Sequence, residues 1–512
     1  MTPKPDFSRK IGFDNEAYIK AQTESILERV DLYQEKLYLE FGGKIMYDYH
    51  ASRVLPGFDP NVKMRLLQEL KDKADIIMCV HAGDIERKKM RADFGISYDS
   101  DALKTIDDFK EWGLDITAVV ITRYKNQPQA RSFKNKLERN GVKVYTHGYT
   151  EGYPTDVDLI VSDQGYGANP HIETTKPIVV VTAPGPGSGK LATCLNNLYH
   201  DYKQGIKAGY AKFETFPIWN LPITHKVNIA YEAATVDLKD IVQIDYHHLE
   251  AYNIKTVNYN RDNEAFPLLK RILEKITGEE AMYKSPTDMG VNRASKGIVN
   301  DEVIAEASHQ EIIRRFFRCK VEYAMGLVEK DSLDRSKEIM EKVKAKEEDR
   351  SVVMPCRQAA QEANKTGKGS DGTYCGAAIE LKDGTIITGK NSPLMHASSS
   401  LILNATKHLA GLPDNILLLP ANMIEKVAFL KKEILTGKMV SLDVEETLIM
   451  LGISAISNPA AQVSIEKLSE LRDCEVHLSH IPTPGDEAGL RKLHVNLTCD
   501  PEFSSTSLFM GE

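Results

Sequence analysis

Short apolar runs alternate with helical stretches between residues 74 and 182, and this alternation limits the possible folds more than any other feature of the chain. The runs are rich in aliphatic and β-branched residues, as in strands buried on both faces. Residues 128–140 have the spacing of an amphipathic helix, and Gly141 follows as a stop signal. Strands separated by such helices form a parallel sheet. We expect its strands at residues 75–81, 117–122, 142–146, 158–162 and 177–182.

The length of the chain and a change in its composition suggest further divisions. With 512 residues, and about 100–200 residues per domain, two to four domains are expected. Long helical patterns begin near residue 301, and residues 329–350 are so densely charged that they read as a solvated helix or connector. We predict an α/β phosphate- or nucleotide-binding domain over residues 1–240, a mainly helical middle region over 241–350 and a C-terminal α/β domain over 351–512.

Charge and cysteine content argue against several classes of function. The chain has 65 basic and 73 acidic residues, and its net charge of -8 repels the backbone of nucleic acids. Its seven cysteines include no CxxC pair, so neither a disulfide framework nor a structural zinc site is expected. Residues 1–10 lack the apolar core of a signal peptide, and the longest apolar runs are too short to span a membrane. We expect a cytoplasmic protein without nucleic-acid or membrane partners.

The strongest local signal is the segment at residues 177–190, which reads PIVVVTAPGPGSGK and precedes a helical stretch at 191–202. Glycines let backbone N–H groups turn toward an anion, the helix N-terminus adds its dipole, and Lys190 can reach terminal phosphates. The segment resembles a Walker A loop. The resemblance implies a P-loop-like phosphate site made of Gly185, Gly187, Ser188, Gly189 and Lys190. A flexible tight turn is the alternative interpretation.

Two positions depart from the Walker A pattern. Pro184 replaces the first glycine, and Leu191 replaces the Ser or Thr whose hydroxyl binds magnesium. Thr193 offers a nearby hydroxyl, and Asp237 and Asp245 downstream are candidate Mg²⁺ ligands. Lys190 and Asp237 are the predicted catalytic residues, and the expected cofactors are ATP and Mg²⁺, without zinc.

A second polar loop near the N-terminus is another candidate ligand site. Its candidate residues are Gly42, Gly43, Lys44, Asp48, His50 and Arg53. The glycines permit close approach of a ligand, and the cations can neutralise phosphates, although a structural loop with surface charges is the alternative. Parallel sheets bind ligands beyond the carboxyl ends of their strands, which adds His81, Arg123 and Asp163 as residues that follow predicted strands.

Several specific strings resemble one family across most of the chain. IGFDN at residues 11–15, FGGK at 41–44, TAPGPGSGK at 182–190 and GTIITGKN at 384–391 resemble the bacterial uncharacterised protein family 0371. The resemblance implies a cytoplasmic protein of several domains and transfers no settled activity.

The C-terminal region is similar in layout to cytidine-deaminase-like domains, in which a β-hairpin precedes a helix. Residues 376–391 form the hairpin pattern, and His396 stands at the start of the helix pattern. Ser398 replaces the proton-shuttling glutamate of those enzymes, and no P-C-x-x-C follows, so a working zinc deaminase is not expected. Such a module can instead form an oligomer interface or a ligand pocket.

These features favour a protein that binds a phosphorylated small molecule. The first hypothesis is an NTP-dependent phosphotransferase or hydrolase acting on a small molecule, with the turn cradling the phosphates. The alternatives are a nucleotide or metabolite sensor without turnover, and a transferase that binds a sugar phosphate without any nucleotide. A homo-oligomer is expected from the frequency of such assemblies among comparable proteins.

Overall fold

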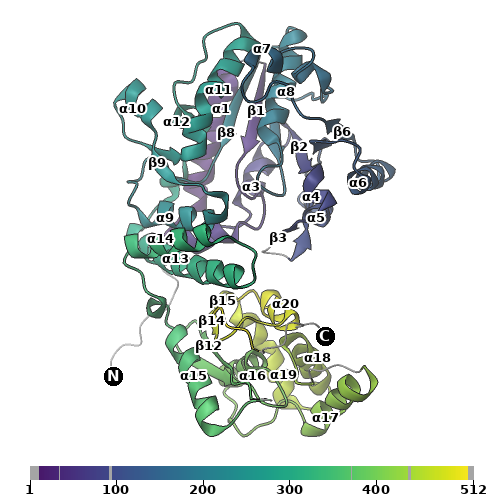
Figure 1. Cartoon of the computed structure of the whole chain (residues 1–512), viewed down its shortest axis with the longest axis vertical. Helices are drawn as coiled ribbons and strands as arrows, with labels where there is room; N and C mark the ends of the chain where they lie inside the picture. The colour runs from purple at the N-terminus through teal and green to yellow at the C-terminus, as the bar shows by residue number, and fades with distance from the viewer. Residues whose placement is uncertain (1–10, 34, 92–94, 371, 436–439, 505–512) are drawn as a thin grey trace. The chain divides into compact units, whose positions relative to one another are not determined.

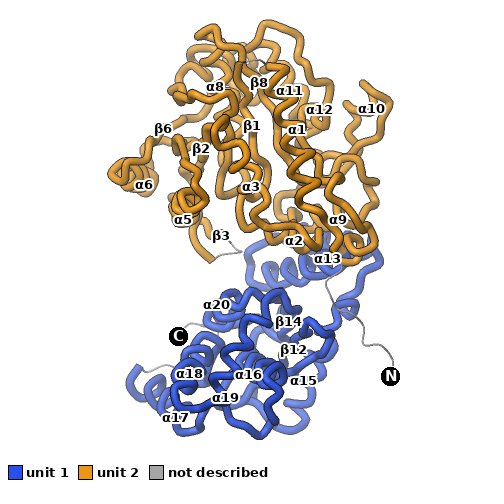
Figure 2. Tube along the Cα trace, turned by 180° about the vertical axis from the view of Figure 1, so that it is seen from behind, with its two compact units in different colours: residues 1–10, 309–512 blue, residues 11–308 orange. Residues whose placement is uncertain are grey.

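The computed structural model describes residues 11–33, 35–91, 95–370, 372–435 and 440–504. The chain divides into two compact units, shown in different colours in Figure 2. The N-terminal unit comprises Ile11–Ser308, and the C-terminal unit begins at His309. The division falls inside helix α13 (Asp301–Ala324), within the region expected to be mainly helical.

The N-terminal unit is built around a parallel sheet of seven strands. The strands run in the order β11 (Gly290–Val291), β8 (Ala208–Phe213), β1 (Lys36–Phe41), β7 (Ile178–Thr182), β2 (Ala74–His81), β5 (Ala118–Thr122) and β6 (Val144–His147). All neighbouring pairs are parallel, as in Leu37 beside Ile178 and Ile77 beside Val181. The parallel sheet predicted from the apolar runs is therefore present. Strand β7 occupies its centre, so the loop after β7 lies at the middle of one edge.

Helices cover both faces of this sheet (Figure 1), which explains why its central strands are buried throughout. One face packs against α7 (Val157–Ile160), α8 (Lys190–Lys203) and α11 (Asn260–Thr277). The other packs against α1 (Asn15–Tyr33), α3 (Val62–Glu69), α4 (Ala82–Glu86), α5 (Tyr98–Glu111) and α6 (Pro128–Arg139). Alternate strand residues, such as Ile76 and Ile77, enter different cores.

One predicted strand is wrong. Residues 158–162 were expected to extend the sheet, and the structure has the short helix α7 there. The Asp156 side chain accepts a hydrogen bond from the Leu159 backbone N–H and caps this helix. The helix buries Val157 and Ile160 against the sheet, so these apolar residues leave water without forming a strand.

The remaining elements of this unit lie in the connections. They are α2 (Tyr49–Val54), β3 (Met90–Arg91), β4 (Ile96–Ser97), η1 (Tyr166–Ala168), α9 (Lys226–Ala234), η2 (Val236–Leu238), β9 (Val242–Ile244), α10 (Tyr246–Tyr252), β10 (Val257–Tyr259), α12 (Pro286–Met289) and η3 (Ala294–Gly297). Strands β9 and β10 pair antiparallel outside the main sheet.

The C-terminal unit has a separate sheet of four strands in the order β13 (Ile386–Lys390), β12 (Gly376–Glu380), β14 (Glu475–Leu478) and β15 (Asn496–Cys499). β12 is antiparallel to both neighbours, and β14 is parallel to β15. The predicted hairpin is therefore present, and the predicted helix after it is α16 (Ala397–Leu409). The other helices are α14 (Lys330–Lys342), η4 (Glu347–Asp349), α15 (Val353–Thr366), α17 (Ala421–Phe429), the π-helix η5 (Leu430–Ile434), α18 (Val444–Ser454), α19 (Pro459–Glu466), η6 (Leu468–Leu471) and α20 (Pro484–Lys492).

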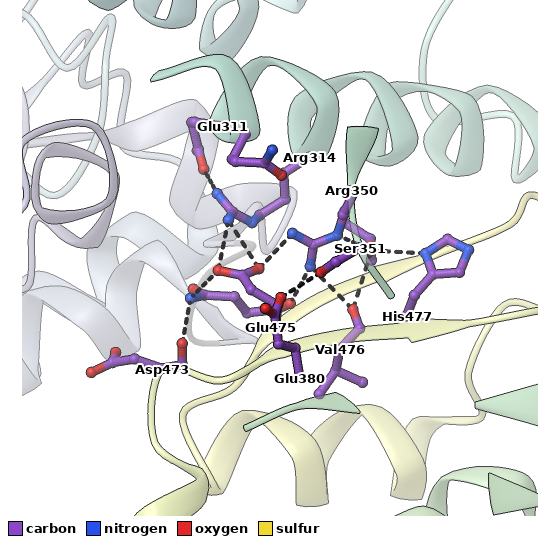
Figure 3. Close-up of polar contacts among 12 residues, drawn as sticks. Glu311, Arg314, Arg350, Ser351, Glu380, Asp473, Glu475, Val476 and His477 are labelled. Carbon is purple, nitrogen blue, oxygen red and sulfur yellow. Dashed lines mark hydrogen bonds and ion pairs between the residues drawn. The ribbon is translucent and has the colours of Figure 1, made fainter. Parts of the chain in front are cut away.

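A buried ionic network stabilises this unit (Figure 3). Arg350 is 1% exposed and pairs with Glu475 on β14, which also binds Arg314 at 3.1 Å. The Arg350 guanidinium also donates to the carbonyls of Val476 and Asn496 at 3.2 and 2.7 Å. It thereby joins the first residues of β14 and β15 to the segment that leads into α15. Because every hydrogen-bonding group of Arg350 is used, its burial is compatible with a stable fold.

Two findings bear on the environment of the chain. Among the described residues, no helix has both the length and the apolar character that crossing a bilayer requires. All seven cysteines are buried and unbridged.

Candidate functional site

The glycine turn leaves the sheet at the carboxyl end of β7 and leads directly into α8. Gly187 and Gly189 both have positive φ, at 69° and 87°, in the region that favours glycine. Gly189 is the N-cap of α8, and Lys190 is its first residue. The helix has 14 residues and begins without a side-chain cap, so its first backbone N–H groups have no capping acceptor. This is the strand, turn and helix order that the sequence predicted.

Contacts from neighbouring elements hold the turn in place. The Ser188 hydroxyl donates to the Gly185 carbonyl at 2.6 Å, and the Thr122 hydroxyl on β5 donates to the Ser188 carbonyl at 2.7 Å. A Cβ atom at Gly189 would lie 2.9 Å from Thr122 Cγ2, and one at Gly185 would lie 2.7 Å from the Tyr98 ring. Both glycines are therefore required by close packing, and the turn is not a loose connection.

Lys190 within the turn and Arg123 next to Thr122 are two cations close to it in the chain or through the contact of Thr122. Lys190 forms no ion pair within the described part of the chain, and Arg123, which follows Thr122, is exposed. Arg123 and Lys125 both lie over the Tyr149 ring, at 5.6 and 4.7 Å from its centre. Positive side chains beside open backbone N–H groups attract an anion.

His81 lies on the same edge, at the end of β2. Its Nδ1 accepts a hydrogen bond from the Asp84 backbone N–H at 3.1 Å and caps α4. Burial lowers the pKa of His81, and the charges of Arg123 and Arg87 lower it further against the opposing effect of Asp84. The imidazole is therefore neutral at pH 7, and its role here is to cap a helix.

The second predicted loop follows β1, which is the neighbour of β7 in the sheet. The Gly42 N–H donates to the Phe213 carbonyl at 2.8 Å, and Gly43 has a φ of 68°. Lys63 is buried beneath the loop and donates to the Lys44 carbonyl at 2.8 Å and the Gly42 carbonyl at 3.4 Å. The loop therefore has a fixed backbone beside the glycine turn.

Asp48 holds Lys63 in this position. Its carboxylate lies 3.2 Å from Lys63 Nζ, and both side chains are 3% exposed. Burial raises the pKa of Asp48, but the charges of Lys63, Lys44 and His50 outweigh it and lower that pKa. Asp48 also accepts a hydrogen bond from the Ala51 N–H and caps α2. It positions the loop.

His50 and Arg53 lie on α2, behind the loop. The His50 ring is buried and packs edge-on against Tyr231, 4.7 Å between centres, beside the stacked pair of Phe216 and Tyr231. Arg53 lies in the last turn of the helix. The structure thus brings Gly42–Lys44 to the edge that holds the turn and places His50 in an aromatic cluster.

A pocket joins the two loops. Lys44, Ile45, Met46 and Tyr47 line it from the β1 side, Thr182, Ala183 and Pro184 from the β7 side, and Met78, Asp101, Thr105 and Asp108 complete it. Polar groups at the carboxyl ends of central strands are the usual position of a ligand site in such sheets.

The other predicted site residues lie elsewhere. Asp163 binds the Tyr199 hydroxyl at 2.7 Å and Lys203 at 3.3 Å. Tyr199 and Lys203 belong to the last turns of α8. At 1.5 Å per residue, Tyr199 stands about 13 Å along the helix from Lys190. The Thr193 hydroxyl is 1% exposed and accepts a hydrogen bond from the Cys79 thiol at 3.4 Å. Neither Asp163 nor Thr193 therefore contacts the glycine turn.

The two predicted magnesium ligands lie in different surroundings. Asp245 is fully buried, and its carboxylate accepts hydrogen bonds from the His248 N–H and from the Thr287 N–H and hydroxyl. Asp237 is exposed on η2. The described residues contain no cluster of three or more His, Cys, Asp or Glu side chains able to hold a metal. A role of these two aspartates as Mg²⁺ ligands stays a prediction.

Sequence reasoning missed Thr122, Tyr98 and Lys63 as supports of the site. Thr122 could have been found because it ends a predicted strand next to Arg123. Tyr98 and Lys63 carry no local signal, since each acts on a loop that is distant in the sequence.

In the C-terminal unit, His396 is the N-cap of α16 and binds Asp486 at 2.7 Å. Ser398 and Thr483 also donate to the Asp486 carboxylate, at 2.7 and 2.8 Å. Burial lowers the pKa of His396, but the hydrogen bond and charge of Asp486 outweigh it and raise that pKa. His396, Ser398 and Thr483 therefore all bind Asp486.

Comparison with known sequences gives consistent results over both units. The family model described as domain of unknown function DUF1846, N-terminal, matches residues 11–344, and its C-terminal counterpart matches residues 348–509. A UPF0371 protein from Clostridium tetani (strain Massachusetts / E88) is 58% identical over 500 residues, which cover 98% of this chain and 99% of the relative. A UPF0371 protein from Clostridium botulinum (strain Langeland / NCTC 10281 / Type F) is 57% identical with the same coverage.

Proposed function

The chain belongs to the DUF1846 family, and we propose that it binds the phosphate groups of a nucleoside triphosphate at the turn formed by Gly185–Lys190 and transfers a phosphoryl group to a small molecule or to water. The observation that carries the proposal is the geometry of this turn. Two glycines of positive φ precede the uncapped first residues of α8, and Lys190 is the first helical residue. An anion bound at the turn is then stabilised by the backbone N–H groups, by the dipole of α8 and by the charge of Lys190.

The charges around the turn support an anionic ligand. The chain as a whole has a net charge of -8, yet Lys190 belongs to the turn, Arg123 follows the Thr122 that binds it, and Lys44 stands on the adjacent loop. Lys190 can neutralise charge that moves onto the phosphate oxygens during transfer. The carboxylate of Asp245 is already bound by the Thr287 N–H and hydroxyl, and no step is assigned to a metal held by Asp237 or Asp245. The catalytic role of Asp237 stays a prediction.

A second candidate function has one specific observation in its favour. Leu191 supplies no hydroxyl at the position that binds magnesium in a Walker A loop, and the Thr193 hydroxyl binds Cys79. A site with this composition suits the phosphate of a phosphorylated substrate, such as a sugar phosphate, without a nucleotide. The protein then acts as a transferase on that substrate.

A thermal-shift experiment distinguishes these functions. Purified protein is heated with ATP and Mg²⁺, with ATP alone, and with glucose 6-phosphate. A ligand at 100 times its dissociation constant adds about 2.7 kcal/mol of stability. We expect ATP to raise the melting temperature and Lys190→Ala to abolish the effect. Lys203→Ala, at the other end of α8, is the matched control and should retain it.

Each result has a distinct meaning. A shift with glucose 6-phosphate alone supports the second candidate, and no shift with any of these compounds contradicts both. A shift with ATP but no phosphate release over many hours indicates a sensor. A Lys190→Ala variant that binds ATP as the original chain does would refute the assignment of the turn.

The C-terminal unit supports a further part of the proposal, a cytidine-deaminase-like fold that works without zinc. The hairpin of β12 and β13 and the helix α16 that follows it support this proposal. His396, Thr483 and Ser398 all bind Asp486, so these three side chains are already engaged. We also propose a cytoplasmic location and a homo-oligomer, and the seven unbridged cysteines are compatible with a reducing compartment.

A further inference from the structure

Helix α18 in the C-terminal unit is apolar on two opposite sides. Its inner side packs Met450 and Leu451 into a core shared with α17 and α19. Its outer side carries Ile449, Ile453 and Ile456, which are 65%, 52% and 85% exposed. A helix that is apolar all round is normally covered all round. The described residues thus leave one side of α18 uncovered.

The three isoleucines form a continuous stripe. Their spacing of four and three residues places them on one face of a helix. Ile456 lies beyond the last residue of α18, but its N–H donates to the Ile453 carbonyl at 3.2 Å, so the helical turn continues through it. No charged side chain interrupts the stripe, since the residue exposed between Ile449 and Ile453 is Gly452.

Gly452 leaves a gap in this stripe. A Cβ atom placed there meets nothing within 4 Å, and the φ of Gly452 is not positive. Neither the backbone conformation nor packing within the described chain therefore requires a glycine. Because glycine destabilises a helix relative to alanine, its presence on the exposed side favours a contact in which another helix comes close.

Leu417 borders the stripe at one end. The Asn458 side chain donates to the Leu417 carbonyl at 3.0 Å, and the Ser454 hydroxyl donates to the Leu418 carbonyl at 2.7 Å. These bonds hold residues 417 and 418 against the last turn of α18. The Leu417 side chain is 67% exposed, so it extends the apolar surface.

Helix α17 and the π-helix η5 border the other end, and both views of the C-terminal unit show α17 next to α18 (Figures 1 and 2). Lys431 Nζ on η5 lies 2.8 Å from a carboxylate oxygen of Glu446, in the first turn of α18. This ion pair places η5 beside the start of the stripe. The exposed apolar side chains here are Phe429, Leu430 and Ile434.

Leu417, the three isoleucines and the three side chains near η5 form what we call the α18 surface. At roughly 180 Å² for a fully exposed leucine, isoleucine or phenylalanine, they present on the order of 800 Å². The largest apolar patch on a typical monomer covers about 300–600 Å². A standard protein interface buries about 800 Å² on each partner. The α18 surface therefore has the area that a stable contact requires.

A second copy of the chain matches this surface. A two-fold axis between Gly452 and Ile453 would set two α18 helices antiparallel, with Ile449 of one copy facing Ile456 of the other. Ile453 of each copy would then lie over Gly452 of the other and fill the gap that the glycine leaves. Because the stripe has no charged side chain, two stripes cover each other without burying an unpaired charge.

We propose that the α18 surface is a two-fold interface between copies of this chain, with antiparallel α18 helices and Ile453 of each copy over Gly452 of the other. This interface gives the proposed homo-oligomer, on which it rests, a specific contact. It does not include the glycine turn, so the phosphate-binding proposal and this one succeed or fail separately.

Sedimentation velocity of the full chain at micromolar concentration tests the interface. We expect an even-numbered assembly, and Ile453→Glu should raise the dissociation constant of the two-fold contact at least 100-fold, because it places carboxylates in an apolar contact. Ile254→Glu changes an isoleucine of nearly equal exposure, 53%, in the N-terminal unit, and is the matched control that should leave the assembly unchanged. Since Ile453 is half exposed in the single chain, Ile453→Glu should keep the original circular dichroism spectrum.

Two further measurements test the antiparallel register. Gly452→Ala fills the gap and should weaken the contact at least 10-fold, although alanine stabilises the helix itself. An Ile449→Cys chain mixed with an Ile456→Cys chain should form a covalent pair with a short bismaleimide, whereas neither chain should link to itself. The native cysteines are all buried, so the new thiols are the ones that react.

Three outcomes overturn the proposal. A monomeric chain shows that no second copy occupies the stripe, and it contradicts the homo-oligomer as well. An assembly that persists in Ile453→Glu uses another surface, which leaves the homo-oligomer intact and refutes this interface. Links between identical Ile449→Cys chains, or unchanged association of Gly452→Ala, refute the packing of Ile453 over Gly452.

Discussion

Replacing Gly189 or Gly187 by alanine tests whether the glycine turn is a rigid element. The two glycines lie two residues apart and have similar φ values of 87° and 69°. They differ in their surroundings, because a Cβ atom at Gly187 meets nothing within 4 Å, whereas one at Gly189 lies 2.9 Å from Thr122 Cγ2 and 3.0 Å from Thr122 Cβ. The pair therefore separates backbone strain from steric overlap.

The magnitudes follow from these two terms. A positive φ costs a non-glycine residue about 1–2 kcal/mol, and this applies to both variants. Overlap in a packed site adds about 1–3 kcal/mol to Gly189→Ala alone. Folded-state costs are therefore about 1–2 kcal/mol for Gly187→Ala and about 2–5 kcal/mol for Gly189→Ala, and we expect the free energies of unfolding of the two variants to differ by about 1–3 kcal/mol. The lower entropy of the unfolded alanine chain offsets both by about 0.4–1 kcal/mol, and so it cancels in the comparison.

Urea unfolding followed by tryptophan fluorescence provides the assay. Trp112 and Trp219 both belong to the N-terminal unit, so the signal reports on the unit that contains the turn. Thr122→Ser removes the nearest methyl group and keeps the hydroxyl that binds the Ser188 carbonyl. It should restore part of the stability lost in Gly189→Ala. Equal losses in the two glycine variants, or no effect of Thr122→Ser, would refute the rigid turn.

Three other predictions concern the cores and the ionic groups. Arg350→Ala removes one of the two arginines that pair with Glu475 and a donor to two strand carbonyls, and should destabilise the C-terminal unit by about 3–5 kcal/mol in urea unfolding followed by circular dichroism. Lys134→Ala, which breaks an exposed pair with Glu138, is its control and should cost less than about 1 kcal/mol. Because the folded-state pKa of Asp48 is lowered, its ionised form stabilises the fold above the unfolded-state pKa of about 3.9, and this contribution is lost as the pH falls toward the folded-state pKa. Asp48→Asn should therefore lower the urea midpoint most at pH 7 and progressively less below pH 4; an equal effect at pH 7 and pH 3 contradicts the buried pair. The seven buried cysteines should react with a thiol reagent such as dithionitrobenzoate only after unfolding, and burial raises the pKa of the Cys79 thiol to about 12. A rapid reaction in the native state would show that the cores open.

Local patterns in the sequence determined most of the regular structure. The strands β2, β5, β6 and β7, the helices α6 and α8, and the C-terminal hairpin with α16 all follow from hydrophobic periodicity and stop signals. The failure at residues 158–162 has the same physical origin. A short apolar run is compatible with either a strand or a helix. The cap by Asp156 and the burial of Val157 and Ile160 stabilise the helix α7.

The sequence alone also determined the chemistry of the glycine turn, because Gly185–Lys190 combine backbone freedom, a helix start and a cation within six consecutive positions. Only the tertiary structure decided which distant residues join it. The position of β7 between β1 and β2 brings Gly42–Lys44 beside the turn. The packing of α8 on the sheet places Thr193 against Cys79, and the packing of α12 beside the start of α10 places Thr287 against Asp245. The exposure of Ile449, Ile453 and Ile456 depends likewise on which side of α18 packs against the core of the C-terminal unit. A pattern within one stretch of chain records what that stretch can form, whereas proximity and burial arise only when separate stretches pack.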